Sequence, residues 1–313
     1  MNTFDYVILA DITCDLSAEI REKIGMTDYL KGHIHFEDGR DFPTDLNWDT
    51  IGREEFYKTL KGKTKITTAP PSPEEYYRAF ESYAKEGKAI LSMSLSAKIS
   101  STHGVASVAA ERVREAYPEA NIYCFDAYRM SAAFGLLTVY AHKLKQEGKS
   151  MEEVIEWLEA HKTCVHQMGP IDDLIFVARR GRLTMGKAIM GNFAGVKPMG
   201  DCNADGYTTV LTKVKGINKA LATTVRYVKE TSVDIENSTV LVAHSDREIY
   251  AKTLKEMIEK ELHPKEVLLT DVFCGCGANV GPGMVAVYYL GTPISEDMEN
   301  EKAVMAAITA KPE

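Results

Sequence analysis

Three short segments of this sequence place hydroxyl side chains just before a predicted helix. They are Asp11–Asp15 (DITCD), Thr67–Pro73 (TTAPPSP) and Ser96–Thr102 (SAKISST). Hydroxyl groups and the free backbone N–H groups of a helix N-terminus together bind carboxylates and phosphates. The same residue types also serve as ordinary helix caps. The pattern therefore leaves two interpretations open, an anion-binding site or three capped helices.

A fourth segment, Gly275–Gly283 (GCGANVGPG), has glycines that would let its backbone approach a ligand closely. Its spacing differs from that of a dinucleotide-binding loop, and Pro282-Gly283 would interrupt the helix that such a loop must open. The sequence contains no G-x-S-x-G, H-E-x-x-H or P-loop motif, and its histidines show no metal-ligand spacing. We therefore predict no catalytic residues, no metal site and no nucleotide cofactor.

The composition is that of a soluble globular protein, with 313 residues of which 45% are hydrophobic and 26% charged. A net charge of -8 argues against nucleic acid as a partner, because phosphate backbones attract basic surfaces. Six cysteines without a C-x-x-C motif exclude a disulfide scaffold. The longest uncharged stretch, Val272–Ser295, has five glycines and two prolines and is not expected to span a membrane. The N-terminus lacks the features of a signal peptide, so a cytoplasmic location is expected.

Strands and helices alternate along the first half of the sequence. Asp15 is expected to cap its first helix, and Ser72 a later one. Apolar runs predict strands at 6–10, 89–95 and 122–125, and the helices are predicted at 16–24, 74–86, 102–117 and 131–146. Such alternation implies a largely parallel sheet, whose strands gather their carboxyl ends, and hence the hydroxyl-bearing segments, at one edge.

The pattern changes beyond about residue 165. The elements predicted there are a strand at 174–177, a hairpin at 198–215, helices at 219–231 and 248–262, and strands at 239–243 and 266–273. The predicted fold class is therefore α/β, with a mainly parallel sheet flanked by helices and a second α/β lobe. The expected division of the chain is an N-terminal lobe of residues 1–165 and a C-terminal lobe of residues 166–313.

Eight short motifs occur in one order along the chain. They are Asp11-x-Thr13-x-Asp15-Leu16, Thr68-x-x-Pro71-Ser72-Pro73, Leu95-Ser96 to Ser100, Asp126 with Ser131 and Gly135, Arg180-Gly181-Arg182-Leu183, Val196-Lys197-Pro198, Asp205-Gly206 and Val280-Gly281-Pro282-Gly283. In this order they resemble the DegV family of bacterial fatty-acid-binding proteins, from about residue 6 to 291. Each motif is weak alone, but eight in order make the resemblance specific.

The resemblance implies two lobes that enclose a long-chain fatty acid such as palmitate in a tunnel, with no other cofactor. It assigns the carboxylate of that acid to Thr68 and Ser100, with Ser101 and Asn279 in the same site. It also implies that the protein is not itself an enzyme and can present the acid to a separate fatty acid kinase subunit. Hydroxyl donors suit a buried carboxylate, because they replace its lost hydration without adding a permanent charge.

Two residues of this site depart from the family pattern. Asn279 stands where the family has a histidine, and Ser101 stands where it has a glycine. An asparagine hydrogen-bonds a carboxylate but carries no charge and shuttles no proton. We therefore expect fatty acid binding to persist, whereas the substitution at Asn279 puts the coupling to a kinase in question.

Residues 174–200 contain no acidic side chain and five basic ones. Arg179, Arg180 and Arg182 are therefore candidate docking residues for an acidic or phosphate-bearing partner. The commoner meaning of such a run is a solvated loop with a few cations, and the sequence leaves both interpretations open.

A second functional hypothesis is an enzyme that acts on a small phosphorylated or carboxylated substrate at the strand ends. It predicts a wet polar pocket and an acid with a shifted pKa near Asp11 or Asp126. The fatty acid carrier predicts an apolar tunnel instead. The absence of a nucleophile–base motif from the sequence favours the carrier.

Overall fold

A parallel sheet of four strands forms the first half of the computed structural model, which describes residues 5–62, 64–184 and 195–310. Its strand order is β2-β1-β6-β7, and every neighbouring pair is parallel. The strands are β1 (Tyr6–Asp11), β2 (Tyr29–Leu30), β6 (Ala89–Ser94) and β7 (Ile122–Asp126). Their carboxyl ends lie at one edge, where two of the three hydroxyl-bearing segments begin, after β1 and β6. The third, residues 67–73, begins instead on β5 (Ile66–Ala69) of a separate small sheet.

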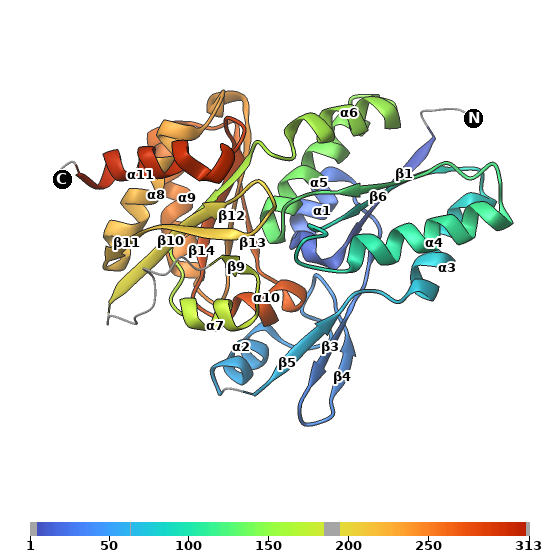
Figure 1. The fold of residues 1–313 in the computed structure, drawn as a ribbon, viewed down its shortest axis with the longest axis horizontal. Coiled ribbons are helices and arrows are strands. Elements are labelled where there is room, and N and C mark those ends of the chain that lie inside the picture. Colours follow the sequence, from blue (N-terminus) through green and yellow to red (C-terminus); the bar gives the residue numbers. More distant parts are fainter. Residues whose placement is uncertain (1–4, 63, 185–194, 311–313) are drawn as a thin grey trace.

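Helices cover both faces of this sheet (Figure 1). On one face, α3 (Pro73–Lys85) and α4 (Thr102–Ala116) share an apolar cluster with β1 and β6. The other face is covered by α1 (Ala18–Ile24), α5 (Ser131–Gln146) and α6 (Met151–His161). Ser72 and Ser150 each form a capping box with the glutamate three residues later, which fixes where α3 and α6 begin.

The second large sheet has the order β13-β12-β14-β8 and is mixed. β12 (Thr239–His244) is parallel to β13 (Glu266–Asp271), whereas β14 (Val285–Leu290) is antiparallel to both β12 and β8 (Val165–Met168). Three helices surround a second apolar cluster against it: α8 (Ile217–Thr231), α9 (Glu248–Leu262) and α11 (Glu299–Ala310). The predicted α/β fold with a second α/β lobe is confirmed. The division of the chain at residue 165 stays a prediction.

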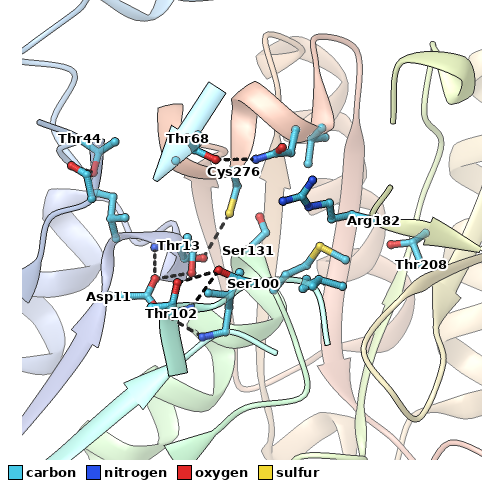
Figure 2. A pocket seen from close by; sticks show the side chains of 18 of the residues that line it. Asp11, Thr13, Thr44, Thr68, Ser100, Thr102, Ser131, Arg182, Thr208 and Cys276 are labelled. Carbon is cyan, nitrogen blue, oxygen red and sulfur yellow. Dashed lines mark hydrogen bonds between the residues drawn. The ribbon is translucent and has the colours of Figure 1, made fainter. Parts of the chain in front are cut away.

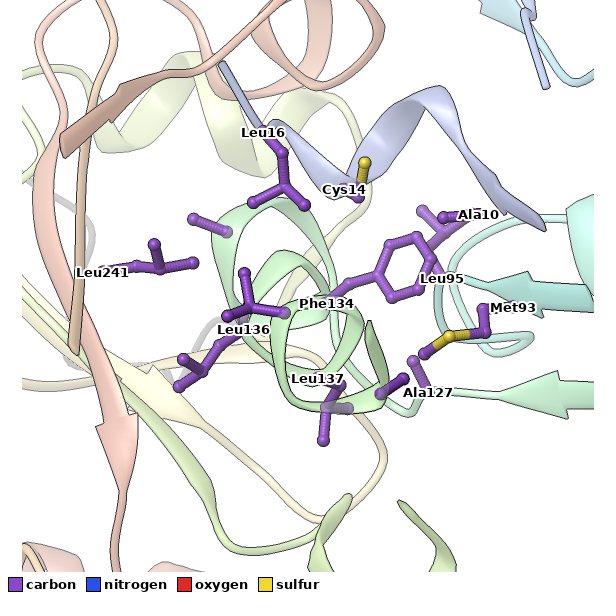
Figure 3. Close-up of a cluster of buried hydrophobic side chains, with 14 of the residues drawn as sticks. Ala10, Cys14, Leu16, Met93, Leu95, Ala127, Phe134, Leu136, Leu137 and Leu241 are labelled. Atoms are coloured by element: carbon purple, nitrogen blue, oxygen red, sulfur yellow. The ribbon is translucent and has the colours of Figure 1, made fainter. Parts of the chain in front are cut away.

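Helix α5 lies between the two large sheets and is buried along most of its length (Figure 3). Phe134 and Leu136 of this helix share one cluster with Met93 of β6 and Leu241 of β12. A helix that is apolar all round is expected to be buried in this way. At Gly135 an added Cβ would lie 2.2 Å from the carbonyl oxygen of Cys14, so glycine permits this close approach of α5 to the turn Ile12–Cys14 that follows β1.

Two small sheets and three short helices complete the part of the fold that surrounds the cavity. The antiparallel sheet β4-β3-β5 consists of β3 (His33–Phe36), β4 (Asp41–Pro43) and β5 (Ile66–Ala69). The other contains the hairpin β10 (Val196–Cys202) and β11 (Thr208–Lys215), with β9 (Leu183–Thr184) beside β11. The helices are α2 (Arg53–Lys61), α7 (Leu174–Arg179) and α10 (Cys274–Val280), and α10 contacts α2, α7 and β5.

Two local predictions differ from the structure. The segment 174–177, predicted as a strand, belongs to helix α7. Asp15 does not cap α1, because Ser17 takes that place and accepts from the Ile20 N–H. Within residues 5–62, 64–184 and 195–310, no helix is long and apolar enough to cross a bilayer.

Candidate functional site

A cavity of about 200 Å³ lies where the carboxyl ends of β1 and β6 meet the second sheet. Both halves of the chain line it. Asp11, Thr68 and Ser100 come from the first half, and Arg182 and Thr208 come from the second (Figure 2). The ends of parallel strands are the usual place for a ligand in an α/β fold, so this cavity is the candidate site.

Thr68 and Asn279 form a hydrogen-bonded pair at this cavity. Thr68 lies on β5 and Asn279 on α10, and the Asn279 Nδ2 donates to the Thr68 Oγ1 at 3.2 Å. A hydroxyl group has one proton to donate and two lone pairs to accept with. Because the Thr68 oxygen already accepts from Asn279, its own proton remains available for a ligand.

Ser100, Ser101 and Thr102 bring three more hydroxyls to the cavity at the start of α4. The Ser100 Oγ lies 2.8 Å from the Thr102 Oγ1 and accepts from the Thr102 backbone N–H at 3.3 Å. Ser101 occupies the N-cap position, but its side chain makes no capping hydrogen bond. The positive end of a long helix therefore adjoins the Ser101 hydroxyl and the one proton that the Ser100–Thr102 hydroxyl pair does not share, a combination that favours an anion.

Asp11 is a fully buried carboxyl group that lines the cavity. It accepts from the Thr13 backbone N–H at 2.8 Å, from the Thr13 hydroxyl, and from the Leu95 N–H at 3.2 Å. Burial raises the pKa of Asp11 to about 6, and the hydrogen bonds from Thr13 and Leu95 oppose this rise. Asp11 therefore ties the end of β1 to the loop that leads to Ser100.

Asp15 is a second buried acid, and it fixes the start of α5. It accepts from the Ser131 hydroxyl at 2.5 Å and from the Phe273 backbone N–H at 2.9 Å. Burial raises the pKa of Asp15 to about 8, so the group is largely protonated at neutral pH. Ser131, which lines the cavity, is thus held between α5 and the segment that enters α10.

Apolar side chains line the remainder of the cavity. They are Ile12, Leu95, Ile99, Met130, Ile171, Val177, Val280, Met284 and Ala286. Several of these belong to the core that surrounds α5. The cavity therefore joins hydroxyl groups to an apolar interior, which suits a molecule with a small polar head and a hydrocarbon chain.

The three arginines of the predicted docking surface have different surroundings. Arg179 is exposed at the end of α7. Arg180 donates through Nη1 to the Ile66 carbonyl oxygen at 2.9 Å and lies over the Phe176 ring, and burial together with the charge of Arg182 lowers its pKa. Arg182 lines the cavity (Figure 2) and donates to the Arg180 carbonyl oxygen. Among the three, Arg179 is the one that faces solvent freely.

Comparison with known proteins identifies the family. The model of a family described as "Uncharacterised protein, DegV family" matches residues 5–292, nearly the whole chain. The chain belongs to the DegV family. A DegV domain-containing protein of Clostridium perfringens is 29% identical over 286 residues, which cover 91% of this chain and 97% of the relative. A DegV domain-containing protein of Streptococcus pyogenes is 28% identical over 291 residues, covering 91% and 98%.

Solved DegV structures share this fold. A DegV family protein from Thermus thermophilus superposes with a TM-score of 0.81 at 22% identity, covering 92% of this chain and 99% of that one. A DegV lipid-binding protein from Thermotoga maritima gives 0.80 at 22% identity, with the same 92% and 99% coverage. A stearic-acid-binding protein from Eubacterium ventriosum gives 0.80 at 20% identity, covering 91% and 98%. At these identities the similarity establishes the DegV fold.

The structure brings together all four residues that the sequence predicts for the DegV site. Thr68, Ser100, Ser101 and Asn279 line one cavity, although Asn279 lies far from the others in the sequence. Their role in binding a carboxylate stays a prediction. The described residues contain no group of three or more His, Cys, Asp or Glu side chains that could hold a metal ion.

Sequence reasoning missed Gln167, Thr208 and Tyr288, which line the cavity from the second half of the chain. Arg182, predicted as a docking residue, lines the cavity, and its docking role stays a prediction. The sequence offered one sign of the missed residues. Gln167 lies between Val165 and Met168, and a polar side chain in a buried strand needs a hydrogen-bond partner.

Proposed function

We propose that this DegV protein binds one long-chain fatty acid, such as palmitate, and carries it without converting it. The carboxylate lies at the hydroxyl groups of Thr68 and Ser100, and the acyl chain runs along the apolar lining. The observation that carries this proposal is the cavity itself, which joins uncommitted donors to an apolar interior. Relatives support it, because the solved proteins from Thermus thermophilus and Eubacterium ventriosum are described as binding fatty acid and stearic acid respectively.

The donors at the cavity suit a carboxylate. An ionised carboxylate that leaves water needs several hydrogen bonds to offset its lost hydration. Thr68, kept as a donor by Asn279, supplies one, and the hydroxyl groups and first-turn N–H groups around Ser100 and Ser101 supply others. Arg182 adds a positive charge to the same cavity. Burial of the acyl chain contributes about 0.8 kcal/mol per methylene, so the hydrocarbon supplies most of the affinity.

An enzyme for a small phosphorylated or carboxylated substrate is the second candidate, and the raised pKa of Asp11 favours it. Both oxygens of this carboxyl group, however, already accept hydrogen bonds from Thr13 and Leu95. Burial raises the pKa of Cys276 well above its ordinary value, so this cavity-lining thiol is a poor nucleophile at neutral pH. We therefore favour a carrier that is not an enzyme.

Native mass spectrometry of the protein purified from bacteria tests the carrier. We expect a long-chain fatty acid bound in one-to-one stoichiometry. Ser100→Ala and Thr68→Val each remove one hydroxyl donor, and each should weaken binding about tenfold. Thr67→Val is the matched control, because Thr67 precedes Thr68 on β5, faces the opposite side and is exposed. A wild-type protein that carries no lipid, even after incubation with palmitate, would contradict the proposal.

The proposed partner is a fatty acid kinase subunit that receives the carboxylate of the bound acid in the cytoplasm. All six cysteines of the chain are free, as in proteins of reducing compartments. Of the three predicted docking residues, Arg179 suits this role, because Arg180 is bonded to β5 and Arg182 belongs to the cavity. Nucleic acid is not a proposed partner, because the chain carries a net charge of -8.

A further inference from the structure

The inner wall of the cavity carries a facing pair of polar side chains. Gln167 of β8 and Tyr288 of β14 are directly opposite each other in the antiparallel register, and both line the cavity. Residues paired in this way point to the same face of a sheet. His166 and Met168, the neighbours of Gln167, point to the other face, where Met168 joins the second apolar cluster.

Both side chains of this pair are deeply buried, Gln167 with 9% and Tyr288 with 3% of its surface exposed. The Gln167 Nε2 donates to the Thr208 Oγ1 at 2.8 Å, and no hydrogen bond between described residues reaches its amide oxygen. The Tyr288 hydroxyl has the Ser131 hydroxyl beside it, but the Ser131 proton is donated to Asp15 at 2.5 Å and is not available to Tyr288. Burial raises the pKa of Tyr288, so its hydroxyl keeps the proton.

The adjacent position on the same strand shows a different pattern. Tyr289 is also buried, but its hydroxyl lies 2.6 Å from the Thr231 Oγ1 and faces away from the cavity. A buried polar group without a partner is costly. The acceptor of Gln167 and the hydroxyl of Tyr288 therefore indicate that something in the cavity completes their hydrogen bonds.

An unsubstituted acyl chain cannot do so, because methylene groups neither donate nor accept hydrogen bonds. A hydroxyl group suits both side chains at once, since it donates to the Gln167 amide oxygen while it accepts from the Tyr288 hydroxyl. We propose that the cavity selects a hydroxylated long-chain fatty acid, whose chain hydroxyl binds between Gln167 and Tyr288. This inference rests on the proposed function and specifies the class of its ligand.

Competition between octadecanoic acid and a positional series of monohydroxylated octadecanoic acids tests this selectivity, with bound ligands counted by native mass spectrometry. At least one isomer should bind about tenfold more tightly than octadecanoic acid, as expected for two hydrogen bonds that are otherwise unmade. Gln167→Leu should reverse that ranking, because leucine replaces the unpaired amide oxygen by an apolar contact. Tyr288→Phe should abolish the preference by removing one hydroxyl. Tyr289→Phe is the matched control and should keep the wild-type ranking.

The outcomes distinguish the selectivity for a hydroxylated acid from the binding of a fatty acid itself. If every hydroxylated isomer binds no better than octadecanoic acid, Gln167 and Tyr288 hold only a water molecule, and the selectivity is refuted while the fatty acid carrier stands. If no acid of either kind binds, the proposed function itself fails. A preference that survives both Gln167→Leu and Tyr288→Phe would also refute the assigned site.

Discussion

Asp15 illustrates how one buried carboxyl group links the stability of the fold to the geometry of its cavity. Its carboxyl oxygens accept from Ser131 and from the Phe273 N–H, so it positions the first residue of α5. Burial raises its pKa from 3.8 to about 8. The folded state therefore holds the proton more tightly than the unfolded state, and the free energy of unfolding falls as the pH rises from about 4 to about 8.

Asp15→Asn should remove this pH dependence, because asparagine stays neutral and still accepts from the Phe273 N–H. We expect the variant to gain stability relative to the wild type as the pH rises, by at least about 1.4 kcal/mol at pH 8, the equivalent of one pKa unit. Urea denaturation at several pH values between 4 and 9 measures the difference. Asp5→Asn, at an exposed position, is the control. A constant difference between Asp15→Asn and wild type across this range would refute the argument.

The residues of the site differ in how far the sequence could predict them. The segments that carry Thr68 and Ser100 are visible in the sequence as hydroxyl groups ahead of predicted helices, but the role of both residues came from the DegV resemblance, because ordinary helix caps use the same residue types. Gln167 and Tyr288 have no such local sign. Whether a polar residue of a buried strand faces a cavity depends on the strand that pairs with it, and β14 lies far from β8 in the sequence.

At the scale of elements, α7 shows that a high strand propensity does not by itself decide the structure of a segment. The run Leu174-Ile-Phe-Val177 is typical of a strand, yet it is helical. Asp173 caps the helix by accepting from the Phe176 N–H at 2.9 Å, and Leu174 and Val177, three residues apart, are its buried face. Helices α3 and α6 were predictable because a capping box lies within four residues. Helix α7 also contacts helix α10, which lies far from it in the sequence, and no local pattern announces that contact.

Arg179 is exposed at the end of α7, whereas Arg182 lines the cavity, and this difference gives a prediction. Arg182→Met removes a positive charge from the cavity and should weaken the binding of palmitic acid about tenfold. The binding of hexadecanol, which has no carboxylate, should change much less. Arg179→Met removes the same charge from the exposed end of α7 and serves as the control. Displacement titrations with a fluorescent fatty acid measure both affinities. An equal loss of palmitic acid affinity in the two variants would show that Arg182 acts only through the net charge of the protein and not inside the cavity.

At the scale of the molecule, α5 joins the two large sheets into one core, and the cavity lies beside its first turn. The sequence predicts a helix at 131–146, and the structure shows that this helix is buried, as expected for one that is apolar on most sides. The sequence does not predict the mixed second sheet, since the antiparallel pairing of β14 with β12 and β8 joins segments far apart in the chain. Such pairings follow from tertiary packing and leave little local trace in the sequence.

The hairpin β10–β11 reaches across from the second half of the molecule to the loop that carries Ser100. The Tyr207 hydroxyl donates to the Lys98 carbonyl oxygen at 2.8 Å, and the Ser96 hydroxyl donates to the Asp205 carbonyl oxygen at 3.0 Å. At Gly206, with φ +88°, an added Cβ would lie 2.5 Å from the Tyr128 carbonyl oxygen, so the turn is in close contact. These contacts restrain the Ser100 loop, and they must loosen if the loop is to move when a ligand leaves.

Tyr207→Phe should therefore speed the release of a bound fatty acid. Loss of one such hydrogen bond favours the open state by about 0.5–1.5 kcal/mol, so the release rate should rise about 2- to 10-fold. Stopped-flow transfer of a fluorescent fatty acid to excess albumin measures this rate. Tyr83→Phe is the matched control, because Tyr83 is equally half-buried and donates to Asp28 at 3.0 Å, away from the hairpin. If Tyr207→Phe and Tyr83→Phe release the acid at the wild-type rate, the hairpin does not restrain the Ser100 loop, and ligand release must use another opening between the sheets.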